Sequence, residues 1–454
     1  MNDFLLILLI GIIFIIFYLI VQYIERRKHR LFDFDRDTKS VKKPERIPEK
    51  KQDTSQVLIG KSQDRNVYLP KDCKHVYVCG TTGAGKTVTL SNFIKTAYKE
   101  DFPMLIIDGK GSIKDNSLLD IVMTLNIYQK KVYVINLNDP VNSDKYNPFC
   151  NTTPTIIKDM LINLNDWSEE HYKLNTERYL QRVIQVLYQA DIKLSFSTIL
   201  NFMDTDNFLT LSATLLRDEK ITKEEHLANG NLAKSSGTIA KDSIARFSNL
   251  LESDIGIIFD ESGIDIYTAL KENAIILFIL NPLMYPELSP TFGRLITIDS
   301  KKAVARFLIE DIERVFFLFD EINVYASKAL LDLINKSREA GITCIPASQS
   351  LSDLEEAESE GFKQQMIENC NNYIIMRQNS HKNAEEWAQI IGTKESHEIT
   401  YQIDSESTST KGSYRNTREF IFHPDDIKSL DVGEAFVISK DKKFKYRVRV
   451  HKPF

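Results

Sequence analysis

A glycine-rich turn between an apolar strand and a helix constrains the fold of this chain more than any other feature. The turn reads Gly80-Thr81-Thr82-Gly83-Ala84-Gly85-Lys86-Thr87 and follows the apolar segment 76–79. The residues that follow it, through position 98, have helical character, so the glycines lie where a strand passes into a helix. In such a turn the backbone N–H groups of residues 83–87 point inward, and the helix N-terminus adds partial positive charge. The sequence therefore predicts a loop that binds the phosphates of a nucleoside triphosphate.

The residue types in this turn indicate which ligands it binds. Lys86 is expected to reach the β- and γ-phosphates, and Thr87 is expected to ligate Mg²⁺. A glycine-rich turn that binds nothing is the alternative, and the strict spacing argues against it. Because the sequence has no Asn-Lys-x-Asp motif for reading guanine, the predicted cofactors are ATP and Mg²⁺. The residues expected to contact the nucleotide are Gly80, Thr81, Thr82, Gly83, Ala84, Gly85, Lys86, Thr87 and Val88.

The N-terminal segment predicts a membrane anchor. Residues 4–24 are uncharged and almost wholly apolar, and they are long enough to cross a hydrocarbon layer of roughly 30 Å as a helix. A cleaved signal peptide would need a preceding basic region and small residues at a cleavage site, which this segment lacks. A basic cluster follows it, so the positive-inside rule predicts a single-pass protein of the cytoplasmic membrane with its remainder in the cytoplasm. A buried hairpin helix of a soluble protein is the alternative. The basic cluster consists of Arg26, Arg27, Lys28 and Arg30.

Composition limits the partners of the chain. With 454 residues and 43% hydrophobic content, it can form two or three domains with full cores. Its formal net charge of −5 is not typical of a nucleic-acid coat protein, so a polyanion would have to meet a local basic surface. Its five cysteines form no CxxC pair and no metal-ligand spacing, which indicates reduced, mainly structural thiols.

The order of apolar segments predicts an α/β fold with an insertion. Strand-like segments at 76–79, 104–107 and 132–135 alternate with helices, which is typical of a parallel sheet covered on both faces. Between about 155 and 253, amphipathic helical patterns replace the strands. The predicted domains are a transmembrane anchor at 1–25, a basic cytoplasmic tether at 26–54, a RecA-like P-loop domain at 55–154 and 254–454, and an all-helical insertion at 155–253.

A second apolar strand predicts the groups that would hydrolyse ATP. Residues 315–319 lead into Asp320 and Glu321, at the end of the strand where ligands collect in parallel sheets. Asp320 is expected to hold Mg²⁺, and Glu321 is expected to polarise the attacking water. Two acids at a strand end can equally be a helix cap or a surface pair. Together with the phosphate loop, however, they indicate an ATPase.

Three further residues are candidates near the nucleotide. Gln349 follows the strand at 343–347 and would lie beside the acidic pair if the strands are neighbours; an ordinary polar turn is its alternative. Arg338 precedes that strand, on the far side of the domain, which suits an arginine supplied to a neighbouring subunit's ATP. A surface salt bridge explains Arg338 nearly as well. Arg377 ends a later strand and is a second candidate for contact with nucleotide or a neighbouring subunit.

A basic ribbon ends the chain. Its composition favours a solvated strand face over a contact with DNA, although both remain open. The ribbon contains Lys440, Lys442, Lys443, Lys445, Arg447 and Arg449.

The order of these pieces resembles the coupling proteins of conjugative type IV secretion, the TraG-like branch of the HerA and FtsK superfamily of ring motors. The pieces are the single anchor, the glycine turn, Ile-Ile-Asp108-Gly-Lys-Gly111, the helical insertion, Phe-Asp320-Glu321 and Ala-Ser-Gln349-Ser-Leu-Ser-Asp353-Leu. The resemblance covers roughly residues 55–450. It implies a homo-hexameric, ATP-hydrolysing motor that recruits a relaxase-bound, single-stranded DNA and delivers it to secretion-channel proteins. It also implies that Gln349 acts near the γ-phosphate and that Arg338 is an arginine finger.

Two other functions stay open at this point. An FtsK- or HerA-like translocase of double-stranded DNA would normally bring more membrane helices and a C-terminal winged module, neither of which is found in the sequence. A membrane-tethered receptor could use ATP only to assemble a ring that binds relaxase or effector proteins. The two enzymatic hypotheses require hydrolysis by Glu321, and the receptor hypothesis does not.

Overall fold

The computed structural model describes residues 56–125, 130–164, 167, 169–310, 314–402 and 411–453. The predicted anchor at 1–25 and tether at 26–54 lie outside these residues. Within the described ranges, no helix is both long enough and apolar enough to cross a membrane.

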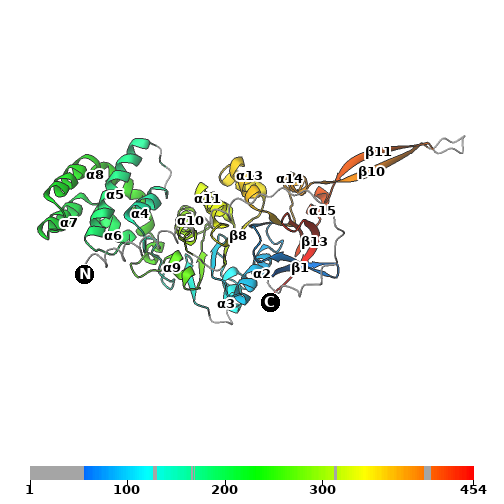
Figure 1. Ribbon diagram of the computed structural model, residues 1–454, viewed down its shortest axis with the longest axis horizontal. Helices are drawn as coiled ribbons and strands as arrows, with labels where there is room; N and C mark the ends of the chain where they lie inside the picture. Colours follow the sequence, from blue (N-terminus) through cyan, green and yellow to red (C-terminus); the bar gives the residue numbers. More distant parts are fainter. Residues whose placement is uncertain are drawn as a thin grey trace, which may run out of the picture. The chain divides into compact units, whose positions relative to one another are not determined.

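An eleven-stranded sheet organises the described residues (Figure 1), in the order β2-β1-β13-β12-β9-β3-β8-β7-β4-β6-β5. The run from β9 to β5 is parallel, and the four strands before it pair antiparallel. The strands are β1 (Gln56–Ser62), β2 (Arg65–Pro70), β3 (Val76–Cys79), β4 (Met104–Asp108), β5 (Val132–Asn136), β6 (Ile275–Ile279), β7 (Val315–Asp320), β8 (Ile342–Ser348), β9 (Asn372–Met376), β12 (Glu434–Ser439) and β13 (Phe444–Val450).

Both faces of the parallel strands are buried, which explains their continuous apolar sequences. In β6, Ile276 and Phe278 belong to one hydrophobic cluster, while Ile275, Leu277 and Ile279 belong to a second cluster. Because successive strand residues point to opposite faces, these clusters are the two layers of core on either side of the sheet. The predicted α/β fold is confirmed.

Helices cover each layer. Helices α2 (Lys86–Lys99) and α3 (Leu118–Leu125) pack on one face, through residues such as Phe93 and Val122. The other face is covered by α9 (Ile266–Lys271), α10 (Leu288–Phe307), α11 (Lys328–Ser337), α12 (Leu351–Ala357), α13 (Glu360–Asn369) and α14 (His381–Ile391). The remaining elements are α15 (Pro424–Lys428), the short 3-10 helices η2 (Asp254–Ile258) and η3 (Ile322–Val324), and the hairpin of β10 (Thr393–Gln402) and β11 (Lys411–Phe420).

From Pro154 to Leu251 the described residues form helices and their connections only. The buried face of α5 includes Tyr179, Val183 and Leu187, and Tyr179 packs edge-on against Phe208 at 5.5 Å between ring centroids. This aromatic ring is therefore core, as its helical spacing predicts. These helices are α4 (Pro154–Ile162), α5 (Glu170–Gln189), α6 (Phe196–Met203), α7 (Thr205–Arg217) and α8 (Lys223–Leu251).

A buried histidine just before β3 predicts a pH-dependent stability. His75 Nδ1 accepts the backbone N–H of Cys344 at 3.0 Å, and burial lowers the pKa of His75 to about 4 from 6.5. Between pH 6.5 and about 4 this histidine is protonated in the unfolded chain but not in the folded chain. The free energy of unfolding therefore falls as pH falls. The pKa difference corresponds to about 3 kcal/mol, lost between pH 6.5 and about 4.

Urea unfolding followed across this pH range measures that loss. His75→Gln is expected to flatten the dependence because its side-chain carbonyl can accept the same N–H without titrating. The exposed His171→Gln is the matched control and is expected to keep the wild-type curve. A His75→Gln curve as steep as that of the wild type would assign the pH dependence to other groups.

Candidate nucleotide-binding site

The glycine turn lies at the C-terminal edge of three neighbouring parallel strands. Gly80 N donates to Ser348 O at the end of β8 (3.2 Å), and Thr81 N donates to Arg377 O after β9 (3.0 Å). Gly83 and Gly85 have φ angles of 77° and 114°, a region that strongly favours glycine. The turn is therefore fixed from both sides before α2 begins at Lys86.

Lys86, Glu321 and Gln349 converge below this turn. Lys86 Nζ donates to Gly80 O at 2.9 Å and lies 3.3 Å from Glu321 Oε1. Gln349 Nε2 donates to Glu321 Oε1 at 3.3 Å, while Gln349 Oε1 accepts from Thr82 Oγ1 at 2.9 Å. Lys86 and Glu321 are each only 7% exposed, so water screens their ion pair little. Three predicted catalytic residues thus form one connected cluster.

The acidic strand end also contains Asp108, which belongs to the motif Ile-Ile-Asp108-Gly-Lys-Gly111 but is not among the metal ligands predicted from the sequence. Asp108 ends β4 and is the register partner of Asp320 on β7. Burial and then the charge of Asp108 raise the pKa of Asp320, and burial raises the pKa of Asp108. Asp108 Oδ1 accepts the N–H groups of Lys110 and Gly111, but Asp320 Oδ1 is buried without a hydrogen-bond partner among the described residues. Two buried carboxylates with an unpaired oxygen favour a cation at this position.

Mg²⁺ fits this donor set. Among the described residues, no group of three or more His, Cys, Asp or Glu side chains could hold a metal by itself. Mg²⁺ does not need such a cage, because it is usually held by one or two carboxylates together with phosphate oxygens and water. Asp320 and Thr87 both line the same pocket and would complete such a site beside bound phosphates.

The cluster opens into a pocket of about 500 Å³. Its wall includes residues that sequence reasoning missed, namely Asn116, Pro282, Leu283, Asn323, Val324 and Val432. They follow β4, β6 and β7 or, for Val432, precede β12, so only the strand order brings them together. Leu283 is 94% exposed at this wall, although it is apolar. The predicted residues that line the pocket are Thr81, Thr82, Gly83, Gly85, Lys86, Thr87, Val88, Asp320, Glu321 and Gln349.

The two candidate arginines lie outside this pocket. Arg338 is exposed and caps the C-terminus of α11, just before β8 begins. Since β8 has 7 residues at roughly 3.3 Å each, its start lies roughly 20 Å from Gln349. Arg377 is adjacent to the turn through its carbonyl oxygen, and its Nε is buried without a hydrogen-bond partner among the described residues. Within one chain, therefore, Arg338 is not part of the cluster.

A parallel sheet, a glycine turn at its C-terminal edge and an acidic strand end facing that turn define a P-loop NTPase domain. Residues 55–283 match the family described as "Helicase HerA, central domain", and residues 314–432 match "TraM recognition site of TraD and TraG". The first match alone covers half of the chain. The chain therefore belongs to the HerA/FtsK superfamily, in its branch of type IV secretion coupling proteins.

Known proteins agree with this assignment. The type 4 coupling protein DotL of Legionella pneumophila is 22% identical over 445 residues, covering 81% of this chain and 56% of DotL, so the chain spans little more than half of that relative. The plasmid coupling protein TrwB with the ATP analogue ADPNP has a TM-score of 0.62 at 17% identity, covering 89% of this chain and 91% of the other. TrwB with ADP and Mg²⁺ has a TM-score of 0.59 at 16% identity, covering 86% of this chain and 88% of the other. TrwB thus binds nucleotide and Mg²⁺. The resemblance predicted from the sequence is confirmed.

Proposed function

We propose that this chain is a membrane-anchored, ATP-hydrolysing motor that couples a relaxase-bound DNA strand to a type IV secretion channel. The observation that carries the proposal is the cluster of Lys86, Glu321 and Gln349 in one pocket at the phosphate loop. A chain that only bound nucleotide would need the loop and its lysine. It would not need a carboxylate and an amide held opposite them.

The cluster also indicates how hydrolysis would proceed. Glu321 shares its Oε1 between Lys86 and Gln349, and its Oε2 is buried without a hydrogen-bond partner among the described residues. Lys86 is placed to turn from Gly80 O to the phosphates of ATP, which leaves Glu321 able to orient and deprotonate a water. Bound Mg²⁺ would neutralise charge on the β- and γ-phosphate oxygens. Glu321 adopts a left-handed conformation (φ 48°), a local strain that a functional orientation of its side chain would explain.

Gln349 links this chemistry to conformational change. Its amide contacts Glu321 on one side and Thr82 of the turn on the other. A γ-phosphate entering between these residues would compete for both hydrogen bonds. Gln349 also precedes α12, whose N-cap is Ser350, so loss of these bonds would be transmitted directly to that helix.

The test of the proposal is ATP turnover by the full chain in detergent, with and without single-stranded DNA. A motor is expected to turn over ATP faster with DNA, because hydrolysis is coupled to movement along the strand. Lys86→Ala is the control and is expected to lose turnover in both conditions. Equal wild-type rates with and without DNA, at protein concentrations that allow rings to form, would contradict the motor hypothesis and favour the hypothesis of a membrane-tethered receptor.

A further inference from the structure

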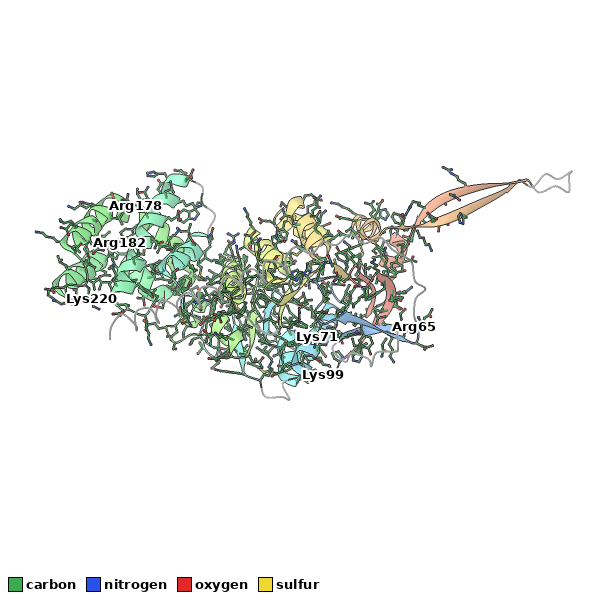
Figure 2. The ribbon with its side chains drawn as sticks, viewed as in Figure 1. Arg65, Lys71, Lys99, Arg178, Arg182 and Lys220 are labelled. Atoms are coloured by element: carbon green, nitrogen blue, oxygen red, sulfur yellow. The ribbon has the colours of Figure 1, made fainter. Side chains whose placement is uncertain are left out.

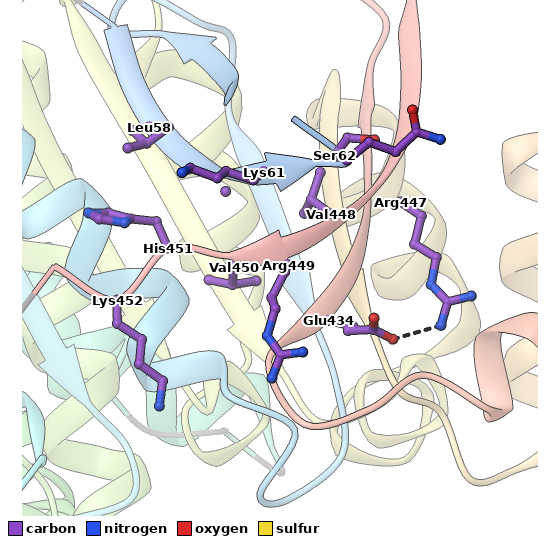
Figure 3. Close-up of a pocket in the computed structure, with 12 residues that line it drawn as sticks. Leu58, Lys61, Ser62, Glu434, Arg447, Val448, Arg449, Val450, His451 and Lys452 are labelled. Atoms are coloured by element: carbon purple, nitrogen blue, oxygen red, sulfur yellow. Dashed lines mark hydrogen bonds and ion pairs between the residues drawn. The ribbon is translucent and has the colours of Figure 1, made fainter. Parts of the chain in front are cut away.

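A second pocket of about 650 Å³ lies on the antiparallel side of the sheet (Figure 3). It is formed by β1, β13 and the residues after β13. We call this pocket the basic groove, after the cationic residues Lys61, Arg449 and Lys452 that line it together with Arg447. Lys61, Arg449 and Lys452 are all exposed, and they come from opposite ends of the sequence. Figure 3 shows Arg447 and Arg449 leaving β13 on the same side of the ribbon, with Glu434 between them.

The charges of this pocket are not balanced within the chain. Arg447 is neutralised by Glu434 at 2.7 Å, and Glu434 is the one acid in the lining. Arg449 lies in register with Lys61 on one side and with Glu434 on the other. Glu434 therefore faces both Arg447 and Arg449 and can offset only one of these two charges, while the like charge of Lys61 opposite Arg449 destabilises the sheet. None of the ion pairs found among the described residues includes Lys61, Arg449 or Lys452. The pKa of His451, in the same lining, is lowered by burial and then by Lys95 and Lys61, as expected in a positive potential. An anionic ligand would supply the missing counter-charge.

The backbone connects this pocket to the phosphate loop. Gly433 N donates to Ala84 O of the turn at 3.0 Å, and Gly433 O accepts from Val450 N at 2.8 Å. His451 O accepts from Asn92 Nδ2 on α2 at 2.9 Å. Val432 lines the nucleotide pocket while Glu434, two residues on, lines the basic groove. A ligand in the groove therefore touches β13, which is connected to the nucleotide-binding turn through the hydrogen bonds of Gly433.

We propose that the basic groove binds the phosphodiester backbone of a nucleic-acid strand. The inference rests on the proposed function, since it names where the motor would hold its DNA. Arg449 and Lys452 both line the pocket, although they lie three residues apart, roughly 10 Å along the chain. Charges spaced in this way suit a linear polyanion better than a single headgroup. Lysine and arginine contacts to phosphates hold a strand without reading its sequence, which suits a motor that moves along DNA.

The test measures binding of a fluorescein-labelled oligothymidylate to the full chain in detergent, at several salt concentrations. The groove variant is Lys61→Gln/Arg449→Gln/Lys452→Gln. The control variant Lys99→Gln/Arg178→Gln/Lys220→Gln removes the same residue types from exposed positions elsewhere (Figure 2). Each lost phosphate contact lowers the slope of log affinity against log salt by about 0.7 for a single strand, so the groove variant is expected to lose about 2 in slope. Its affinity at low salt is expected to fall roughly tenfold, and the control is expected to follow the wild type.

The other outcomes are equally informative. Equal salt slopes for the groove and control variants would contradict DNA binding by the groove and leave the motor proposal intact. A wild type that binds no DNA would contradict both proposals. Melting temperatures separate function from structure: removing opposed like charges is expected to leave the groove variant at least as stable as the wild type, and a clear loss of stability would make these cations structural. Micelles with phosphatidylglycerol, but not with phosphatidylcholine alone, could stabilise the wild type through this site. If the groove variant lost that stabilisation and kept its DNA affinity, the site would bind the membrane surface instead of DNA.

Discussion

Replacing Glu321 by glutamine is expected to stop ATP hydrolysis while leaving ATP bound. The substitution keeps the size of the side chain and an oxygen able to accept from Gln349, but it removes the carboxylate that would take a proton from water. Loss of a positioned general base costs roughly 10²–10⁴ in rate. Single-turnover hydrolysis is therefore expected to fall by at least roughly 10², while the affinity for a fluorescent ATP analogue stays close to that of the wild type.

The retained binding has a specific structural reason. Lys86 Nζ keeps its hydrogen bond to Gly80 O when the partner carboxylate is neutralised, and the backbone of the turn is held by Ser348 and Arg377 rather than by Glu321. The phosphate contacts should therefore survive. Glu224→Gln, which makes the same change at an exposed position on α8, is the matched control and should leave both measurements unchanged. A Glu321→Gln chain that hydrolyses ATP at the wild-type rate, or supports full DNA transfer in cells, would contradict the motor and leave the receptor hypothesis.

The sequence predicts the centre of this site because local patterns define it. The glycine turn and the acidic pair each follow an apolar strand directly, and parallel strands bring their carboxyl ends to one edge of a sheet. Gln349 could be predicted for the same reason. That Lys86 and Glu321 approach to 3.3 Å therefore follows from short-range patterns and one general rule of topology.

The rest of the site depends on strand order, which no local pattern contains. Asp108 faces Asp320 because β4 pairs with β7 in register, although the two residues are far apart in sequence. The basic groove cannot be predicted from the sequence for the same reason. Arg449 belongs to a terminal ribbon whose composition favoured a solvated strand face, and only the pairing of β1 with β13 sets it opposite Lys61. Arg449 is exposed, as predicted, but the like charge of Lys61 opposite it becomes visible only in the sheet.

Replacing Arg338 by alanine is expected to lower ATP turnover by roughly 10³ without affecting ATP affinity. Arg338 lies at the opposite edge of the sheet from the pocket of its own chain, so it can reach an ATP only when a second copy supplies it. Mixing tests this directly: Arg338→Ala chains retain an intact pocket, Lys86→Ala chains retain the arginine, and a mixed assembly contains sites that combine both. Activity is expected to reappear on mixing two chains that are each inactive. Lys336→Ala, an exposed neighbour on the same helix end, is the control and should stay active. If mixing restores nothing while Arg338→Ala remains inactive and folded, Arg338 does not act in trans, and Arg377 becomes the arginine to test.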